Sequence, residues 1–135
     1  MNIIDLAFIS DKIKKEIFHK TKLNMSQVRL ICFFENNENK PVAMGELAES
    51  LQISPSTLSR QLHQPKTATL LSSQKVANSS SKKVALNERG QELAAELRKQ
   101  LGEMNKRLTA DWPQAEADSF ATMVTRLRSR LEQEC

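Results

Sequence analysis

Two short helical patterns joined by a very tight connection constrain the fold of this chain most. The first spans residues 45–51. The second is predicted to start after Ser54, which can cap a helix N-terminus, with Pro55 at the first helical position. The connection between the two patterns is only Gln52 and Ile53. Two short helices joined in this way, with an apolar residue in the turn, predict a helix-turn-helix.

Longer helices are predicted on both sides of this unit. Apolar side chains recur at three- and four-residue steps over residues 3–20 and 88–110, and again after a break at residues 111–113. A further helix is predicted from Asn24 to about Glu35, because Gln27 stands three residues after Asn24 and completes a capping box. Its apolar run is nearly continuous, so we expect this helix to be buried on most sides.

A β-hairpin is predicted between these helical parts. Two short apolar stretches, at residues 70–71 and 84–86, flank a polar segment, residues 74–81, that contains no glycine. A tight two-residue turn is therefore disfavoured, and we expect a long loop at the tip. Pro65 is expected to end the second helix of the helix-turn-helix.

The composition agrees with a mainly helical chain. Aromatic residues make up 4% of the 135 residues, and there are three glycines and four prolines, fewer than a β-sandwich usually needs. The predicted fold is mainly α with a small β-hairpin wing. We expect one domain over residues 1–135, with a winged helix-turn-helix at 23–87 and dimerisation helices at 1–22 and 88–135.

The positive charge is concentrated in one segment. Residues 54–90 hold six basic residues and one acidic residue, a net charge of +5, whereas the whole chain carries +4. A concentrated basic patch is typical of a protein that binds a polyanion. A solvated charged loop is the alternative interpretation. The residues concerned are Arg60, Lys66, Lys75, Lys82, Lys83 and Arg89, against Glu88.

One polar face of the second short helix is the candidate recognition surface. This face holds Ser56, Ser59, Arg60 and His63, at positions i, i+3, i+4 and i+7 of the helical repeat, opposite the inward-facing Leu58 and Leu62. Arg60 can make a bidentate contact with guanine, and serine can contact a base or a phosphate. A merely solvated polar face is the alternative. The predicted major-groove residues are Ser56, Thr57, Ser59, Arg60 and His63.

Apolar stripes on the first and last helices predict self-association. A chain of this length cannot easily bury two long terminal helices and an N-terminal helix against itself, so we expect a second copy to cover them. The predicted dimerisation residues are Leu6, Ile13, Leu101, Leu108, Phe120, Val124, Leu127 and Leu131.

The sequence gives little support for an enzyme, a metal protein, a redox sensor or a membrane protein. There is no nucleophile–base constellation and no glycine-rich phosphate loop, so an enzyme is not expected. His19 and His63 are isolated, so neither a metal nor another cofactor is predicted. Cys32 as a thiol-based redox sensor is a weaker alternative, because no nearby cation would lower its pKa. With no secretory signal or long apolar run, we expect a cytoplasmic protein without a membrane association.

Three motifs are similar to those of the MarR family of bacterial regulators. The segment from Gly45 to Arg60 resembles the family's helix-turn-helix, the segment 86–90 (LNERG) looks like its "LTxxG", and the segment 23–27 (LNMSQ) looks like its "LTxxQ". The resemblance spans nearly the whole chain. It implies a homodimer held by the first and last helices, with two winged domains on one pseudo-palindromic stretch of double-stranded DNA. It also implies a small-molecule effector bound between the winged domain and the dimerisation helices.

The chain departs from the family pattern in the wing. The family's wing carries an "R…DxR" pattern, whereas here Ser72 and Ser73 and then residues 78–81 (NSSS) stand in its place. Lys75, Lys82 and Lys83 are instead expected to contact phosphates, without the planar fork of arginine. The family's recognition helix also continues past the position of Pro65. These departures motivate an alternative function, a protein-interaction module or anti-regulator with weakened DNA binding.

Overall fold

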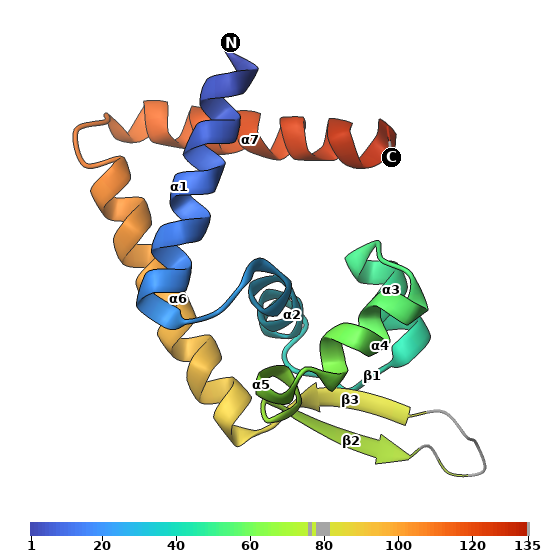
Figure 1. The fold of residues 1–135 in the computed structure, drawn as a ribbon. Coiled ribbons are helices and arrows are strands. Elements are labelled where there is room, and N and C mark those ends of the chain that lie inside the picture. Colours follow the sequence, from blue (N-terminus) through green and yellow to red (C-terminus); the bar gives the residue numbers. More distant parts are fainter. Residues whose placement is uncertain (76, 78–81, 135) are drawn as a thin grey trace. The chain divides into compact units, whose positions relative to one another are not determined.

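The computed structural model describes residues 1–75, 77 and 82–134 of the chain (Figure 1). It divides into two compact units, Met1–Leu101 and Gly102–Cys135, which are described separately below. The elements in chain order are α1 (Ile3–Thr21), α2 (Met25–Asn36), β1 (Val42–Ala43), α3 (Met44–Leu51), α4 (Pro55–His63), α5 (Pro65–Ala68), β2 (Leu71–Lys75), β3 (Lys82–Leu86), α6 (Glu88–Leu108) and α7 (Gln114–Glu134).

The predicted capping box at the start of α2 is confirmed. The side chain of Asn24 accepts a hydrogen bond from the backbone N–H of Gln27 at 3.0 Å. In return, the side-chain oxygen of Gln27 accepts from the backbone N–H of Asn24 at 2.9 Å. These two bonds satisfy donors that the first turn of a helix leaves without partners, so the sequence determines where α2 begins.

Helix α2 lies in the core of the first unit, as its apolar run predicts. Leu30, Ile31 and Phe34 are each at most 3% exposed. Side chains from the neighbouring elements complete this core, including Leu47 of α3, Leu58 of α4 and others below 2% exposure. The largest fully buried side chains are those of Phe34, Leu23, Ile31, Leu47, Leu58, Leu70, Leu97 and Thr67.

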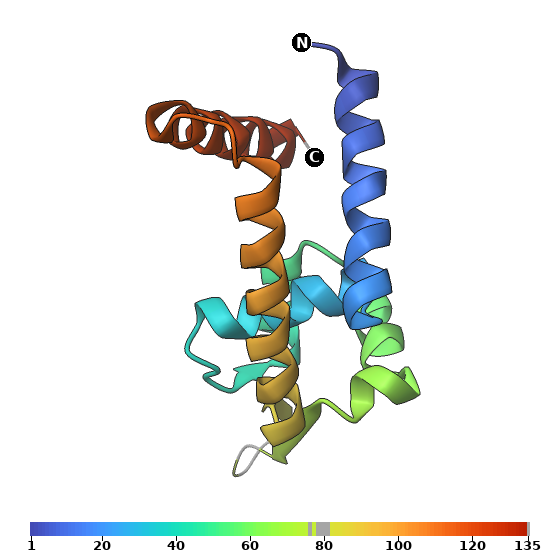
Figure 2. The ribbon, with the colours of Figure 1, turned by 90° about the vertical axis from the view of Figure 1, so that its left-hand side faces the viewer.

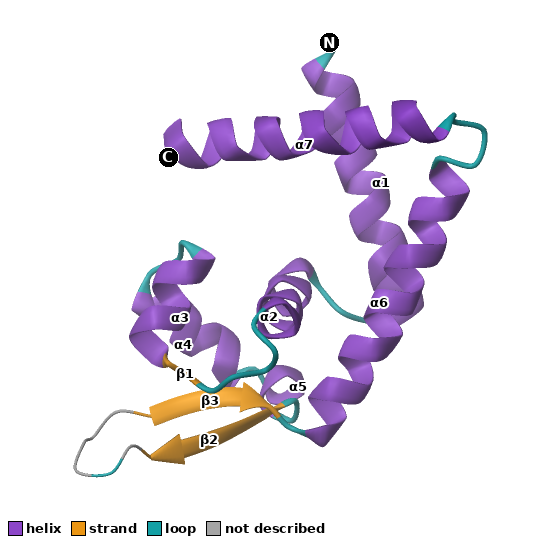
Figure 3. Cartoon of the chain, turned by 180° about the vertical axis from the view of Figure 1, so that it is seen from behind, coloured by secondary structure: helices purple, strands orange, loops and turns teal. Residues whose placement is uncertain are grey.

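The predicted hairpin is confirmed, and it is part of a three-stranded antiparallel sheet with the order β1-β3-β2. Figure 3 shows β2 and β3 side by side in this hairpin. In the register, Leu71 pairs with Leu86 and Lys75 with Lys82. Of the long loop expected at residues 74–81, residues 76 and 78–81, which include the NSSS stretch, lie outside the described residues.

Strand β1 is not predicted by the sequence, where residues 36–41 are typical of a loop. Its pairing with β3 is prepared by Asn39, which has a left-handed backbone conformation with φ 54°. The Asn39 side-chain oxygen accepts from the Leu86 N–H at 2.8 Å, and its amide donates to the Leu86 carbonyl at 3.0 Å. The side chain thus pairs with the end of β3 as a strand backbone would, which holds the chain in place just before β1.

The short helix α5 is also missed by the sequence interpretation. Pro65 ends α4 as expected, but it also occupies the first turn of α5, a position that proline favours. Thr67 of α5 is buried in the core, and the Lys66 ammonium donates to the backbone carbonyl of Lys22. Figure 2 shows the C-terminal end of α1 above α5. Helix α4 is therefore followed by a turn of helix that is attached to the end of α1.

The second unit is dominated by α7, which starts after Pro113 as predicted. The backbone N–H of Ala117 donates to the carbonyl of Pro113 at 3.1 Å in the first turn. Trp112 and Phe120 contact each other edge to face, with ring centroids 5.2 Å apart. Many apolar side chains of α7 remain exposed, so the helix presents an apolar face.

Candidate nucleic-acid interface

The predicted helix-turn-helix is present in α3 and α4. Gln52 adopts a left-handed conformation with φ 56°, which ends α3 and reverses the chain within three residues. The Ser54 hydroxyl then accepts from the Thr57 N–H at 3.1 Å, as expected of an N-cap. Leu58 and Leu47 are buried, so the inner face of α4 is fixed to the core. Figure 1 shows α3 and α4 adjacent to each other on one side of the sheet.

The outer face of α4 carries the predicted recognition residues. Ser56, Arg60 and His63 are exposed, and Thr57 and Ser59 are partly buried. These residues lie opposite Leu58 and Leu62, which are at most 9% exposed. The arrangement of a polar outward face and an apolar inward face that the spacing predicts is therefore present.

Hydrogen bonds within α4 hold the Arg60 side chain along the helix. A terminal guanidinium nitrogen of Arg60 donates to the Thr57 hydroxyl at 3.3 Å. The Thr57 hydroxyl also accepts from Ser54 at 2.8 Å. Arg60 is exposed, so its other guanidinium N–H groups are accessible from solvent. The sequence interpretation predicts Thr57 as a groove contact and missed its bond to Arg60.

His63 is oriented by the preceding turn of α4. Its Nδ1 lies 2.7 Å from the backbone carbonyl of Ser59 and 3.4 Å from the Ser59 hydroxyl. Because a carbonyl oxygen only accepts, this geometry places a proton on Nδ1. In the neutral ring, Nε2 is then an acceptor that faces away from the helix backbone.

The three wing lysines are exposed on the hairpin. Lys75 of β2 and Lys82 of β3 are directly opposite each other in the register. Lys83 pairs with Gln74 on one side and with Ala43 on the other. Directly opposed residues project from the same face of a sheet, so the two ammonium groups of Lys75 and Lys82 repel each other. Such a pair is stabilised by an anion that binds between them.

No acidic side chain offsets this positive charge nearby in the sequence. The whole segment 55–86, which includes α4, α5 and both hairpin strands, contains no Asp or Glu. Arg60, Lys66 and the wing lysines therefore belong to a segment whose charged side chains are all basic. Surfaces of this kind attract polyanions and raise their rate of association.

Cys32 lies partly buried in α2. Burial, followed by the neighbouring Glu35 carboxylate, raises the pKa of the Cys32 thiol above its ordinary value of 9.0. The thiolate is the reactive form of cysteine, so this environment disfavours a redox-sensing role.

Within residues 1–75, 77 and 82–134, no three His, Cys, Asp or Glu side chains are grouped so that they could hold a metal ion. None of the helices in the same residues is long and apolar enough to cross a membrane.

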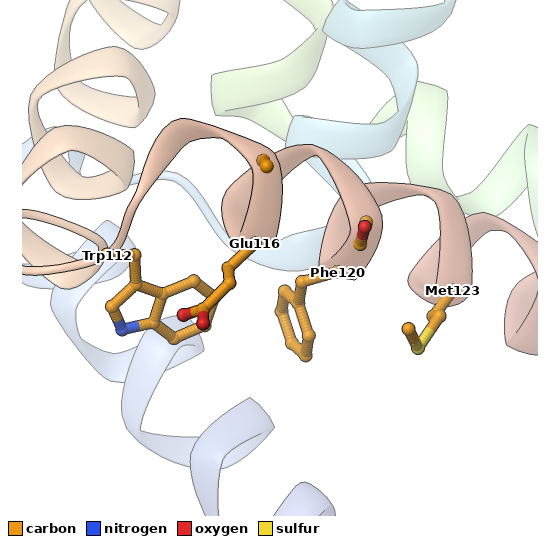
Figure 4. Close-up of a pocket in the computed structure, with 6 residues that line it drawn as sticks. Trp112, Glu116, Phe120 and Met123 are labelled. Atoms are coloured by element: carbon orange, nitrogen blue, oxygen red, sulfur yellow. The ribbon is translucent and has the colours of Figure 1, made fainter.

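The predicted dimerisation residues differ in exposure. Leu6, Ile13 and Leu101, which belong to the first unit, are partly buried. Those of the second unit are exposed, by 39% to 63% of their surface: Leu108, Phe120, Val124, Leu127 and Leu131. The sequence interpretation treated Trp112 only as part of a chain break, and missed that it contacts Phe120 at one end of this apolar surface (Figure 4).

Solved structures with the same fold cover almost the whole chain. The DNA complex of MepR from Staphylococcus aureus has a TM-score of 0.77 and 17% identity, over 97% of this chain and 98% of that chain. A structure of MepR described as a transcription regulator of the S. aureus multidrug efflux pump MepA has a TM-score of 0.73 and 18% identity, over the same shares of both chains. A MarR family protein from Bacillus stearothermophilus has a TM-score of 0.71 and 14% identity, over 98% of this chain and 99% of that chain.

Comparisons of sequence alone find less. No protein-family model matches the chain, and no curated protein matches it. The motifs at residues 23–27, 45–60 and 86–90 occupy the start of α2, the α3–α4 pair and the start of α6. The resemblance that these motifs indicate is thus confirmed in three dimensions. The chain has the winged helix-turn-helix fold of the MarR family of regulators.

Proposed function

We propose that this chain is a DNA-binding transcription regulator that inserts α4 into the major groove of double-stranded DNA. The observation that carries the proposal is the outward polar face of α4, with exposed Arg60, on a segment that contains no acidic residue between positions 55 and 86. The fold is also that of MepR, which has been solved in complex with DNA. A helix-turn-helix places its second helix in the major groove, with the N-terminal residues against base edges.

Each residue of the outward face has a chemical role in this proposal. Arg60 donates two hydrogen bonds to the O6 and N7 atoms of a guanine. Ser56 and Ser59 contact bases or phosphates, and the Nε2 atom of His63 accepts or donates toward the groove. Thr57 holds Arg60 through the 3.3 Å bond described above.

The wing lysines bind the phosphate backbone in this proposal. A phosphate that approaches Lys75 and Lys82 relieves the repulsion between two ammonium groups that stand directly opposite each other. Lys83 projects from the other face of the hairpin and contacts a different phosphate. Such contacts set the position of the protein on DNA and carry no sequence information of their own.

A homodimer is the second part of the proposal. Residues 23–87 form the DNA-binding part, and residues 1–22 and 88–135 form the dimerisation part. Support comes from the exposed apolar side chains of α7, because large exposed apolar patches mark interaction surfaces. Two copies related by a twofold axis bind two half-sites about one helical turn apart.

A small-molecule effector is the third part. A ligand that binds more tightly to one spacing of the two recognition helices than to another shifts the protein toward that spacing. The bound ligand then changes the DNA affinity by the coupling free energy between the ligand site and the DNA-binding surface.

The experiment that tests the proposal begins with selection from random duplex DNA by the purified protein. The selected site is then titrated with the wild type, with Arg60→Ala, and with Arg126→Ala as a control that removes one arginine charge from exposed α7. We expect Arg60→Ala to lower the affinity by roughly 5- to 150-fold and to relax specificity at one base position. Arg126→Ala should keep both.

Two other results would assign the chain to another class. Undetectable binding to any duplex at low salt, with folding intact, would favour the protein-interaction module that the serine-rich wing motivates. Loss of DNA binding on mild oxidation, absent in Cys32→Ser, would favour the thiol-based sensor.

A further inference from the structure

His63 is the last residue of α4 and stands at one end of its outward polar face. It follows Ser56 by seven residues, so the two side chains project from the same side of the helix. At 1.5 Å per residue they are separated by about 10 Å along the helix axis, which is less than the roughly 12 Å width of the major groove. The groove therefore has room for the whole polar face, His63 included.

The imidazole ring of His63 is held by the main chain of α4. Its Nδ1 atom lies 2.7 Å from the carbonyl oxygen of Ser59, one turn earlier. A carbonyl oxygen only accepts, so Nδ1 carries the single proton of the neutral ring, and Nε2 is left with a lone pair. Because the acceptor is a backbone atom, this arrangement does not require the Ser59 side chain.

The Nε2 atom of His63 is available to a partner outside the protein. Within the part of the chain that the structure describes, both hydrogen-bond contacts of the ring are made by Nδ1, and the side chain is exposed. An acceptor on the outward face of α4 is therefore open to a donor that approaches in the groove.

Arg60 and His63 offer opposite chemistry to the bases. The guanidinium of Arg60 only donates hydrogen bonds, whereas Nε2 of the neutral His63 ring only accepts them. In the major groove, guanine presents the acceptors O6 and N7, and thymine presents the acceptor O4. The donors there are the exocyclic amines, N6 of adenine and N4 of cytosine. Only these amines can satisfy the lone pair of Nε2.

We propose that His63 is a specificity-determining residue whose Nε2 atom accepts a hydrogen bond from the exocyclic amine of an adenine or a cytosine. His63 follows Arg60 by three residues, about 4.5 Å along the helix, so the amine lies one or two base pairs from the guanine that Arg60 contacts. The inference rests on the proposed function and adds a base choice at a second position. Guanine or thymine on the same strand would place an acceptor against Nε2 and is disfavoured.

Selection from random duplex DNA by the wild type and by His63→Leu locates this base. Leucine has no acceptor and is a good helix former. We expect the wild type to select adenine or cytosine one or two base pairs from the guanine, and His63→Leu to lose this preference while it keeps the guanine. His63→Gln should retain part of the preference, because its side-chain oxygen also accepts. The selections are made at about pH 8.5, above the range in which imidazole usually changes charge.

Removal of the amine from the DNA tests the individual hydrogen bond. Unsubstituted purine in place of adenine, or pyrimidinone in place of cytosine, deletes only the exocyclic nitrogen. We expect this deletion to weaken wild-type binding by roughly 2- to 12-fold, the effect of one hydrogen bond, and to leave the affinity of His63→Leu unchanged. The same deletion outside the selected half-site is the control and should affect neither protein. Fluorescence anisotropy titrations measure each dissociation constant.

Nuclear magnetic resonance of the imidazole nitrogens tests the ring without DNA. The chain has two histidines, so the spectrum of His63→Gln identifies the signals of His63 by their absence. At the same pH, we expect the free wild-type protein to carry the His63 proton on Nδ1 and none on Nε2. A proton on Nε2 would overturn the inference and would leave the Arg60 contact of the proposed function intact.

The DNA-binding outcomes also separate the inference from the proposed function. A folded chain that binds no duplex would overturn both. A selected site with guanine or thymine at the second position, or a preference unchanged in His63→Leu, would overturn the role of His63 alone. An equal loss of affinity of His63→Leu for every sequence would assign His63 to a phosphate contact and would likewise overturn it.

Discussion

The side-chain amide of Gln27 donates to the hydroxyl of Thr67 at 3.2 Å, and both residues are at most 4% exposed. Gln27 also completes the capping box of α2, so one side chain joins the start of α2 to α5, the turn that follows α4. A buried amide left without an acceptor costs more free energy than the bond itself contributes. This pair therefore holds the end of the helix-turn-helix against the core.

Removing the Thr67 hydroxyl should lower the stability of the folded protein. We expect Thr67→Val to lower the free energy of unfolding by about 1–3 kcal/mol, because the Gln27 amide then has no acceptor in the core. Urea denaturation followed by circular dichroism measures the change. Thr122→Val, which removes an exposed hydroxyl on α7, should change the free energy by less than about 0.5 kcal/mol. Equal effects of the two substitutions would contradict the role assigned to the pair.

Gly90 should not tolerate a side chain. A Cβ atom there would lie far inside contact distance of the Leu70 carbonyl oxygen and 3.0 Å from the Leu86 Cβ. We expect Gly90→Ala to lower the free energy of unfolding by about 1–3 kcal/mol. Gly102→Ala, in the same helix α6 but with nothing within 4 Å, should raise it by roughly 0.5–1 kcal/mol. Thermal or urea unfolding of both variants should therefore give opposite signs.

The wing lysines should govern the salt dependence of DNA binding. Each phosphate contact that is lost should reduce the slope of log K against log salt concentration by roughly 0.9. We expect Lys75→Ala and Lys82→Ala each to do so while leaving base preference unchanged. Anisotropy titrations at several salt concentrations measure the slope, and Lys99→Ala, at an exposed position of α6, is the control. If the slope is unchanged in all three variants, the proposed contact between the wing lysines and DNA is contradicted.

Cys32 should react slowly with alkylating reagents at neutral pH. Burial first, and the Glu35 carboxylate second, raise the pKa of its thiol above 9.0, so the folded protein favours the protonated form. The corresponding contribution to stability is present below about pH 9 and is lost as the pH rises through the raised pKa. We expect the alkylation rate, followed by mass spectrometry, to rise only at higher pH than for a free cysteine. The Cys135→Ser background isolates the reaction, because Cys135 is the other cysteine of the sequence.

The local features of the fold could be predicted because their causes are local. Asn24 with Gln27, and Ser54 with Pro55, determine where α2 and α4 begin through bonds that span only three residues. The two faces of α4 follow from the helical repeat, since Leu58 and Leu62 are the apolar residues on its inner side.

The features that were missed depend on contacts between distant residues. Strand β1 forms because Asn39 pairs with Leu86, 47 positions later, and no pattern in residues 36–43 indicates this. Helix α5 is one turn long, so it has no periodicity to detect. It is held in place by hydrogen bonds of Lys66 to Lys22 and of Thr67 to Gln27. The residues that form the polar face of α4 could be predicted from the helical repeat. The bond between Thr57 and Arg60 could not, because it depends on side-chain rotamers that the sequence does not specify.

The early end of α4 at His63 limits how much sequence one copy can inspect. A helix of nine residues is about 14 Å long, which corresponds to roughly four base pairs at 3.4 Å each. In the proposed function a single α4 therefore reads too few bases to distinguish one operator among the many chance matches of a genome. Selectivity must therefore come from two such half-sites at a fixed separation. The distance between the two α4 helices of a dimer then determines specificity as much as their side chains do.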